Sequence, residues 1–386
     1  GVDVAVVAIE FCGLSETPVL VAIPLFTFAG FLLSAGHAPA RLVRLSQALL
    51  GWLPGGLAMI SLVACAIFTA FTGASGVTII ALGALLLPAL SQSGYDERFN
   101  LGLITSSGSL GLLFAPSLPL ILYGIVAEAP IDDLFLAGLL PGILILAVLA
   151  VYCYWRNRRL RYVVTTGSWS AAWDAIWAAR WDLPLPVVVL GGIYGGVFAV
   201  SEAAAVTALY VAVIELVVLR EVPWRDVPRI MRESMVLVGA ILAILGVSLA
   251  STNLMIDTEV PQRLFAFVSD YITGPTTFMI ALLVFLLILG TILDIFSATV
   301  LVVPLLLPLA AQYGIDPIHL GIVFLAAMEL GYLTPPVGLN LFIASHRFEK
   351  DITEIYWATQ PFLIVSLLAV IIIAFWPSLS LMLLNR

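Results

Sequence analysis

The sequence predicts an all-α polytopic membrane protein built as an internal repeat, each copy holding a re-entrant helical hairpin and a broken transmembrane helix. Three observations predict this fold class: an apolar composition, a duplicated motif, and apolar segments that are interrupted in mid-course. The 386 residues are 62% hydrophobic and 10% charged, with a mean hydropathy of +1.14. A chain this apolar cannot bury its side chains in a water-soluble core, so we expect it to cross a membrane several times.

The duplicated motif begins at Leu85 with LLLPALSQSGYDERFNLG and at Leu305 with LLLPLAAQYGIDPIHLG. Landmark residues of the two copies pair at an offset of 220 (308 − 88 = 220) or, after a slip of one residue, 219 (335 − 116 = 219). The pairs are Pro88 with Pro308, Gly94 with Gly314, Asp96 with Asp316, Gly102 with Gly321, and Pro116 with Pro335. A near-constant offset predicts that the two halves of the chain are copies of one unit.

In the first half, 2–14 is too short to span a bilayer, which needs about 20 apolar residues, whereas 18–35 is long enough. Two short apolar arms, 57–69 and 77–88, flank FTGASG and predict a hairpin with its tip at 72–76. The following segment, 95–123, is long enough to cross but contains SSGSLGLLFAPS, which predicts a broken helix. Broken apolar segments at corresponding places in two halves indicate the binding site of a secondary transporter.

The middle of the chain holds a spanning segment at 134–155, an expected interfacial helix, and a helical pair at 183–198 and 203–219. The interfacial helix carries Trp169, Trp173, Trp177 and Trp181, which share one aromatic face. A further span is expected at 234–251. The second hairpin is predicted with arms 276–293 and 300–309 and a tip at 293–299, followed by a broken span at 318–344 and a last crossing at 357–384.

These segments divide the chain into seven parts. They are 1–54, the first hairpin with its broken helix (55–127), a span with a basic cytoplasmic loop (128–168), the interfacial helix (169–182), 183–274, the second hairpin with its broken helix (275–346) and 347–386.

Charge predicts the orientation. The basic cluster 156–161 marks a cytoplasmic loop, and alternating the spans outward from it brings every other basic cluster to the same side. The two hairpins then enter from opposite faces, so the repeat is expected to be inverted. A net charge of −8 argues against nucleic-acid binding, and the chain carries no Walker A motif for ATP and no catalytic constellation. We therefore expect neither an enzyme nor an organic cofactor.

The breaks offer small and hydroxyl-bearing residues whose unwound backbone can bind ions and anions. Candidate substrate-binding residues are Thr72, Gly73, Ser75, Ser107, Ser297 and Asn340. Candidate Na⁺-binding residues are Gly73, Gly76, Ser106, Gly108, Asp294, Thr299, Gly331, Thr334 and Gly338. The alternative is that the small residues only allow close helix contacts and that Asp294 and Glu329 only cap or shape a loop. Glu202 is expected to cap a helix, and Glu215 is expected to pair rather than to transport.

The chain resembles the large membrane subunit of TRAP transporters, the tripartite ATP-independent periplasmic family, over nearly its whole length. The resemblance rests on IPLFTFAGFLL, GYDERFNLGLITSSGSLGLLFAPSLPLILYG, GGIYGGVFAVSEAAAV and GIDPIHLGIVFLAAMELGYLTPPVGLNLFIAS. It implies an elevator-type carrier in the bacterial inner membrane, driven by a Na⁺ gradient, that imports an organic acid. In such a carrier the two hairpins and broken helices (55–127 and 275–346) form a transport domain. The resemblance makes 1–54, 128–168, 183–274 and 347–386 its scaffold and 169–182 a connecting helix between the halves. It also implies two partners besides the lipid bilayer: a periplasmic substrate-binding protein and a small four-helix membrane subunit.

The sequence departs from the family pattern at three places. The first tip reads FTGASGV rather than a Gly-Ser-rich run followed by Asp, Ala115 stands where a Pro is usual, and the usual first spanning helix is absent, so we expect the N-terminal helix to be missing. Two other functions stay open: a stand-alone carrier of the divalent-anion type, and a membrane assembly subunit that does not transport.

Overall fold

The computed structural model describes residues 17–50, 56–158, 169–258 and 274–384, together with Arg263 and Ile272. Every regular element in these ranges is helical. Seven helices are long and apolar enough to cross a membrane, and one bent pair would make an eighth. The prediction of a multi-span, all-helical membrane protein is therefore confirmed. The predicted short segment 2–14 and the end of the basic cluster at 159–161 lie outside the described residues.

The first hairpin consists of α4 (Gly56–Thr72) and α5 (Ser75–Gln92), which pack against each other. Only Gly73 and Ala74 separate the two helices, and Gly73 has a φ of +64°, a conformation that residues with a side chain rarely adopt. The break therefore lies inside the predicted tip at 72–76.

The second hairpin consists of α14 (Pro275–Gly290) and α15 (Ile295–Gln312). Its break covers residues 291–294, so the predicted tip at 293–299 and the predicted start of the second arm at Val300 were wrong. The carboxylate of Asp294 accepts hydrogen bonds from the backbone N–H groups of Phe296 and Ser297, at 3.0 and 3.2 Å. This N-cap satisfies donors that the first turn cannot pair, and α15 starts five residues earlier as a result.

Each hairpin is followed by a broken helix that begins in the same way. The first consists of α6 (Glu97–Ser107), a short 3₁₀ turn η3 (Leu110–Leu113) and α7 (Leu118–Val126), with a bend of 44°. The second consists of α16 (Pro317–Gly331) and α17 (Leu339–Phe348), separated by residues 332–338. Asp96 and Asp316 cap α6 and α16 by accepting from Phe99 N and Ile318 N.

A cis peptide bond precedes Pro116 in the first break and Pro336 in the second.

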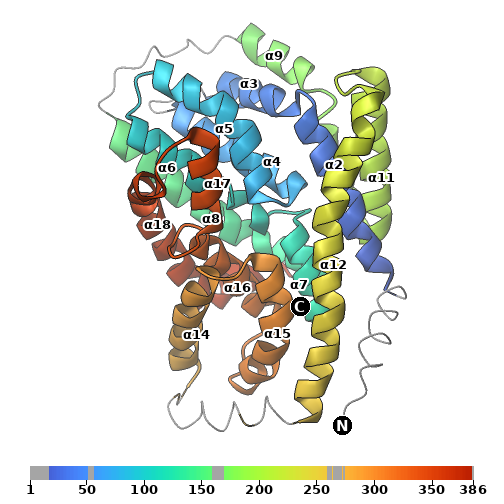
Figure 1. Ribbon diagram of the computed structural model, residues 1–386, viewed down its shortest axis with the longest axis vertical. Coiled ribbons are helices and arrows are strands. Elements are labelled where there is room, and N and C mark those ends of the chain that lie inside the picture. The colour runs from blue at the N-terminus through green and yellow to red at the C-terminus, as the bar shows by residue number, and fades with distance from the viewer. Residues whose placement is uncertain are drawn as a thin grey trace.

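Three long helical segments run side by side along one edge of the molecule (Figure 1). They are α2 (Ala22–Ala35, preceded by η2, Pro18–Val21), α11 (Val200–Val213, continued by the π-helix η4, Ile214–Val218) and α12 (Val227–Asp257, preceded by η5, Trp224–Asp226). Figure 1 shows α4 and α5 in the upper half of the view and α14 and α15 in the lower half. The two hairpins thus occupy opposite ends of the molecule.

The remaining helices are α3 (Ala38–Leu50), α8 (Ile131–Asn157), α9 (Trp169–Ala178), α10 (Pro184–Tyr194), α18 (Ile352–Phe375) and α19 (Pro377–Leu381). Helices α8, α18 and α19 pack against the broken helices, α3 and α9 lie at the upper end of the view in Figure 1, and α10 packs against α11. The predicted last crossing at 357–384 was wrong at both ends, because α18 starts at Ile352 and stops where Pro377 opens α19. The predicted Trp helix is present as α9, which packs on α3 and leaves Trp173 and Trp177 exposed.

The packing of α8 and α18 bears on the predicted domains. α18 packs against α6, α8, α16 and α17, and α8 packs against α4, α7 and α16. Both helices therefore contact the hairpins and broken helices extensively, although the sequence prediction assigned 128–168 and 347–386 to a scaffold.

Candidate substrate and ion site

The first tip is joined to the first break by one threonine hydroxyl. Thr69 Oγ1 lies 2.8 Å from the carbonyl oxygen of Cys65, 2.9 Å from that of Gly108 and 2.7 Å from Thr78 Oγ1. Thr69 belongs to α4, Thr78 to α5, and Gly108 ends α6. The buried Thr69 hydroxyl therefore links α4, α5 and the end of α6.

Two glycines allow the same elements to approach closely. A Cβ atom on Gly73 would lie 2.5 Å from Leu118 Cγ at the start of α7, and one on Gly108 would lie 2.5 Å from Ile79 Cγ1 on α5. Both distances are far shorter than real Cβ contacts, so a side chain at either place would force the tip and the break apart.

The second tip is joined to the second break through backbone and a tyrosine. Val337 N donates to the carbonyl oxygen of Thr291 at 3.1 Å, and Ile295 N donates to Tyr332 Oη at 2.8 Å. Gly331, the last residue of α16, lies directly against the backbone of Gly290, the last residue of α14. Each hairpin tip thus contacts the break of its own repeat.

Contacts between the repeats bring the two breaks together. Asn340 Nδ2, in the first turn of α17, donates to the carbonyl oxygen of Thr105 near the end of α6, at 3.3 Å. A Cβ atom on Gly76 would lie 2.7 Å from Ile343 Cδ1, also on α17. The start of α17 therefore sits beside the first tip and the first break, at the level where both helices are interrupted.

The candidate substrate residues fall into two groups by their hydrogen bonds. The side-chain oxygens Thr72 Oγ1 and Asn340 Oδ1 are buried and have no hydrogen-bond partner among the described residues. Ser107 Oγ, by contrast, donates to Ile104 O at 3.2 Å, while Ser75 opens α5 and Ser297 lies in the first turn of α15. Thr72, Ser75, Ser107 and Asn340 are thus gathered at the first tip and break, whereas Ser297 belongs to the second tip.

The candidate Na⁺ residues also occupy both tips and both breaks. The Thr299 hydroxyl donates to Ile295 O of its own helix, α15, whose start the Asp294 carboxylate caps. The Thr334 hydroxyl, in the second break, donates to Leu330 O near the end of α16. Ser106 Oγ is buried and has no partner in the part of the chain that the structure describes. Gly338, with a φ of +54°, precedes α17 as its N-cap residue.

An apolar cavity of about 390 Å³ flanks the first tip on one side. It is lined by residues of α2, α3, α4 and α8, by Phe114 and Ala115 of the first break, and by 182–186. Among the described residues that line it, Asp182 is the one that carries a charge, and Thr72, Gly73 and Ser75 are not part of the lining. The described lining is thus apolar apart from one carboxylate, which would repel an anion. Beside the cavity α2 packs directly on the first tip, since a Cβ atom on Gly30 would lie 2.6 Å from Thr72 Cα.

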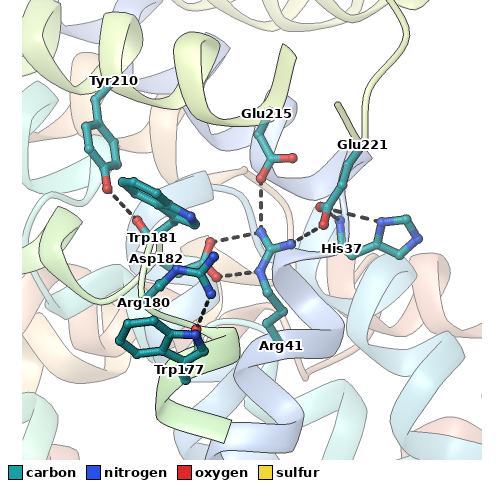
Figure 2. Close-up of polar contacts among 9 residues, drawn as sticks. All are labelled: His37, Arg41, Trp177, Arg180, Trp181, Asp182, Tyr210, Glu215 and Glu221. Carbon is teal, nitrogen blue, oxygen red and sulfur yellow. Dashed lines mark hydrogen bonds and ion pairs between the residues drawn. The ribbon is translucent and has the colours of Figure 1, made fainter. Parts of the chain in front are cut away.

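A buried ion cluster lies away from the breaks, and Figure 2 shows it. The Arg41 guanidinium on α3 bonds to three carboxylates: Asp182 at 2.6 and 3.1 Å, Glu215 at 3.2 Å, and Glu221. Glu215 is fully buried, and its pairing with Arg41 confirms the expectation that this residue pairs. The cluster ties the start of α3 to the junction between α9 and α10 and to the end of η4.

Three members of this cluster, Arg41, Asp182 and Glu221, lie outside the membrane spans and have shifted pKa values. Burial raises the pKa of Asp182, although its bonds to Arg41 act in the opposite direction. For Glu221, burial also favours the neutral form, but the hydrogen bonds from Arg41 and from His37 N outweigh it and lower the pKa. The bonds to the carboxylates likewise outweigh burial at Arg41 and raise its pKa.

Sequence reasoning missed several residues of these contacts. Thr69, Thr78 and Tyr332 lie outside the Gly- and Ser-rich runs that marked the tips, and Arg41 was used only to orient the chain. Two hydroxyls nine residues apart in the two arms of one hairpin would have been a usable signal for Thr69 and Thr78. The capping role of Glu202 is confirmed, since its Oε2 accepts from Ala199 N at 2.9 Å.

Comparisons with known proteins agree with this architecture. The model of the family described as "Tripartite ATP-independent periplasmic transporter, DctM component" matches residues 2–379. The C4-dicarboxylate TRAP transporter large permease protein DctM of Pseudomonas aeruginosa is 33% identical over 382 residues, covering 98% of this chain and 89% of that protein. The ectoine TRAP transporter large permease protein TeaC of Halomonas elongata is 30% identical, covering 94% and 86%.

Two further similarities concern chain organisation and fold. The isethionate TRAP transporter permease protein DctMQ of Oleidesulfovibrio alaskensis is 32% identical over 97% of this chain, which spans 59% of that protein. The solved structure of the YdaH transporter of Alcanivorax borkumensis is similar with a TM-score of 0.63 and 13% identity, covering 97% of this chain and 87% of that one. At that identity the likeness concerns the fold.

Proposed function

Because the chain belongs to the DctM family, the large permease component of TRAP transporters, we propose that it imports an organic acid into the cell in symport with Na⁺. The chain is a multi-pass transporter permease and not an enzyme. The names of similar permeases include C4-dicarboxylate, isethionate and ectoine, so family membership leaves the solute open. Within that range we propose a small carboxylate, for the reasons of local chemistry below.

The observation that carries the proposal is the meeting of helix ends at the tips and breaks. α5 and α7 begin at the first tip and break, and α15 and α17 begin at the second. Helix N-terminal ends carry about half a positive charge and favour a carboxylate, while the ends of α4, α6, α14 and α16 favour a cation. We place the carboxylate among Thr72, Gly73, Ser75, Ser107, Ser297 and Asn340.

The coupling ions are proposed to bind at the two tips through carbonyls and hydroxyls. The candidates stay those of the sequence prediction: Gly73, Gly76, Ser106 and Gly108 at the first, and Asp294, Thr299, Gly331, Thr334 and Gly338 at the second. The cap bonds of Asp294 support a loop-shaping role for its carboxylate. The backbone and hydroxyls around it are then the proposed ligands.

The proposed mechanism is an elevator built as an inverted repeat, with the hairpins re-entering the membrane from opposite faces. The positions of the hairpins at opposite ends of the molecule support the inversion. We propose α2, α11 and α12 as the fixed scaffold, with the hairpins, the broken helices, α8 and α18 moving as a body. The apolar cavity between α2, α3 and α4 supports a boundary there, because apolar surfaces without interlocking polar contacts can slide.

Two partners are proposed from the family: a periplasmic binding protein that delivers the solute, and a small four-helix membrane subunit. One similar permease is named DctMQ and is longer than this chain, which supports a close association of the two membrane parts. We also propose that the permease lies in the bacterial inner membrane, because a TRAP system includes a periplasmic component.

The test is uptake into proteoliposomes that contain this chain with the small subunit, with and without the binding protein. Radiolabelled solute, identified first by a thermal-shift screen of organic acids on the binding protein, should accumulate only with an inward Na⁺ gradient and the binding protein present. Uptake without the binding protein would favour a stand-alone carrier. Uptake that survives changes at Gly73, Ser107 and Gly338, while complex formation is lost, would favour an assembly subunit.

A further inference from the structure

A small, partly polar cavity lies inside the helical core and is lined by residues of both breaks. Glu329 on α16 is only 4% exposed, and its Oε1 atom has no hydrogen-bond partner among the residues that the structure describes. Ser106 on α6 is 2% exposed, and its Oγ atom likewise has no partner among them. Both residues line one cavity of about 10 Å³. Two unsatisfied buried polar groups at one void call for a missing occupant, because such groups in native proteins are normally paired.

The lining of this cavity is built from oxygen donors on separate elements. Ser109, between α6 and η3, and Ser366 on α18 complete the polar part, and both are at least nine-tenths buried. The other lining residues are apolar: Leu110, Ile145, Ala326, Leu330, Leu333 and Val370. None of the described lining residues carries a positive charge, so none of them neutralises Glu329.

The field in the cavity favours a cation. Glu329 lies two residues before the end of α16 at Gly331, and Ser106 lies one residue before the end of α6 at Ser107. Both helices present their C-terminal, negative ends to this region. An ionised carboxylate between two negative helix ends, enclosed by apolar helices, is costly unless a cation binds beside it.

The size of the cavity and the chemistry of its donor atoms narrow the choice of cation. A cavity of about 10 Å³ of probe space holds roughly one water-sized sphere. One carboxylate with hydroxyl oxygens is a hard, singly charged donor set, and the described residues contain no group of three or more His, Cys, Asp or Glu that could hold a multivalent metal. A single monovalent cation with an affinity for oxygen fits this description.

We propose that Glu329, Ser106, Ser109 and Ser366 form a buried Na⁺ site. It deepens the proposed Na⁺ coupling and rests on it. Ser106 is also a candidate at the first tip, but the Glu329 carboxylate and the Ser366 hydroxyl belong to neither tip, so the site they form is an additional one. Through Ser366 the ion links α18 to both broken helices. An occupied site would neutralise Glu329 before the helices move through the membrane.

The test measures bound ²²Na⁺ per chain on the purified complex with the small subunit, at equilibrium. Glu329→Gln keeps the shape of the side chain and removes its charge, and it should lower the number of bound ions by one. Glu233→Gln, which changes the same residue type at an exposed position on α12, should bind as many ions as the unaltered chain. Ser366→Ala should keep the number of ions and weaken the affinity for one of them about three- to tenfold, as expected for one hydroxyl ligand.

Two results would overturn the site. If Glu329→Gln binds the full number of ions with unchanged affinity, the sodium assignment is wrong. If this variant also no longer releases the proton that the unaltered chain releases when the Na⁺-free protein is made alkaline, Glu329 carries a proton instead. If the unaltered complex binds no Na⁺, both this site and the proposed coupling fail. Na⁺ binding that depends on Glu329, with solute uptake independent of a Na⁺ gradient, would support the site and reject the coupling alone. If Glu329→Gln folds poorly, the Na⁺ affinity of the Ser366→Ala variant still decides the test: unchanged affinity for every ion would reject the site.

Discussion

Gly331 lies so close to Gly290 that a Cβ atom on Gly331 would be 2.4 Å from the Cα atom of Gly290. Gly331→Ala should therefore separate the ends of α14 and α16 and destabilise the protein by about 1–3 kcal/mol, the usual cost of overpacking. We expect a lower thermal melting temperature in detergent and loss of solute uptake. Gly239→Ala on α12 is the control, because a Cβ atom there meets nothing within 4 Å, and it should leave both unchanged or slightly raise stability.

Asp294 gives a prediction that separates capping from ion binding. Asp294→Asn keeps an oxygen that can accept from Phe296 N and Ser297 N, whereas Asp294→Ala removes it. If the carboxylate acts as a cap, the alanine variant should lose about 1 kcal/mol of stability and the asparagine variant little. The Na⁺ concentration that half-saturates uptake should stay the same in the asparagine variant. A large rise in that concentration would instead make the charge of Asp294 part of the ion site.

Thr69 holds the first tip to the first break, so its hydroxyl is expected to matter more than its size. Thr69→Val keeps the shape but leaves Gly108 O and Thr78 Oγ1 without this partner, at a cost of about 1–3 kcal/mol. Thr69→Ser keeps the hydroxyl and should retain most of the stability and uptake. Thermal unfolding and uptake of both variants check this, and equal behaviour of the two would contradict the role of the hydrogen bonds.

The Arg41 cluster predicts a large loss of stability on substitution of Arg41, which a second substitution should partly restore. Arg41→Gln leaves Asp182, Glu215 and Glu221 without their common partner and should destabilise the protein by about 3–5 kcal/mol, as removal of one member of a buried ion pair does. Adding Glu215→Gln should recover part of this loss, because it removes the most buried of the three carboxylates. Arg44→Gln, at an exposed position on the same helix, is the control, and chemical unfolding is the measurement.

The lowered pKa of Glu221 sets the sign of a pH effect. Because the folded state favours the ionised carboxylate, the stabilisation is fully present above the unfolded pKa and is lost as the pH falls through the folded pKa. The difference in melting temperature between the unaltered protein and Glu221→Gln should thus be constant near neutral pH and shrink below about pH 4.5, the usual range for Glu. A difference that grows on acidification would contradict the ion pair.

Much of the architecture was predictable, because composition and helix-breaking residues act locally. The first tip followed from Gly73, and the paired caps followed from the repeat, since Asp96 and Asp316 stand before the broken helices in both copies. The second tip was misplaced because the sequence does not show that the Asp294 side chain folds back onto its own helix start. In the first hairpin no acidic residue stands at the corresponding place to suggest it.

The candidate site was predictable in its location but not in its connections. Asn340 and Thr105 are 235 positions apart, and their contact depends on how α17 packs beside α6. That Glu329 and Ser106 line the same cavity depends likewise on how helices of the two repeats are arranged in space. Spacing along the chain carries no information on such contacts, and apolar helices such as α18 show no periodic face from which their neighbours could be inferred.

The length of α12 has a consequence for how the protein sits in a bilayer. Its 31 residues rise about 46 Å at about 1.5 Å each, well beyond a hydrocarbon layer of about 30 Å. The helix must therefore tilt or project from the membrane, and its first turns carry Arg229 and Arg232 on the side where we expect the cytoplasm. Anionic lipid headgroups would meet these guanidinium groups, so the charge of the inner leaflet becomes a determinant of the angle at which this long helix stands.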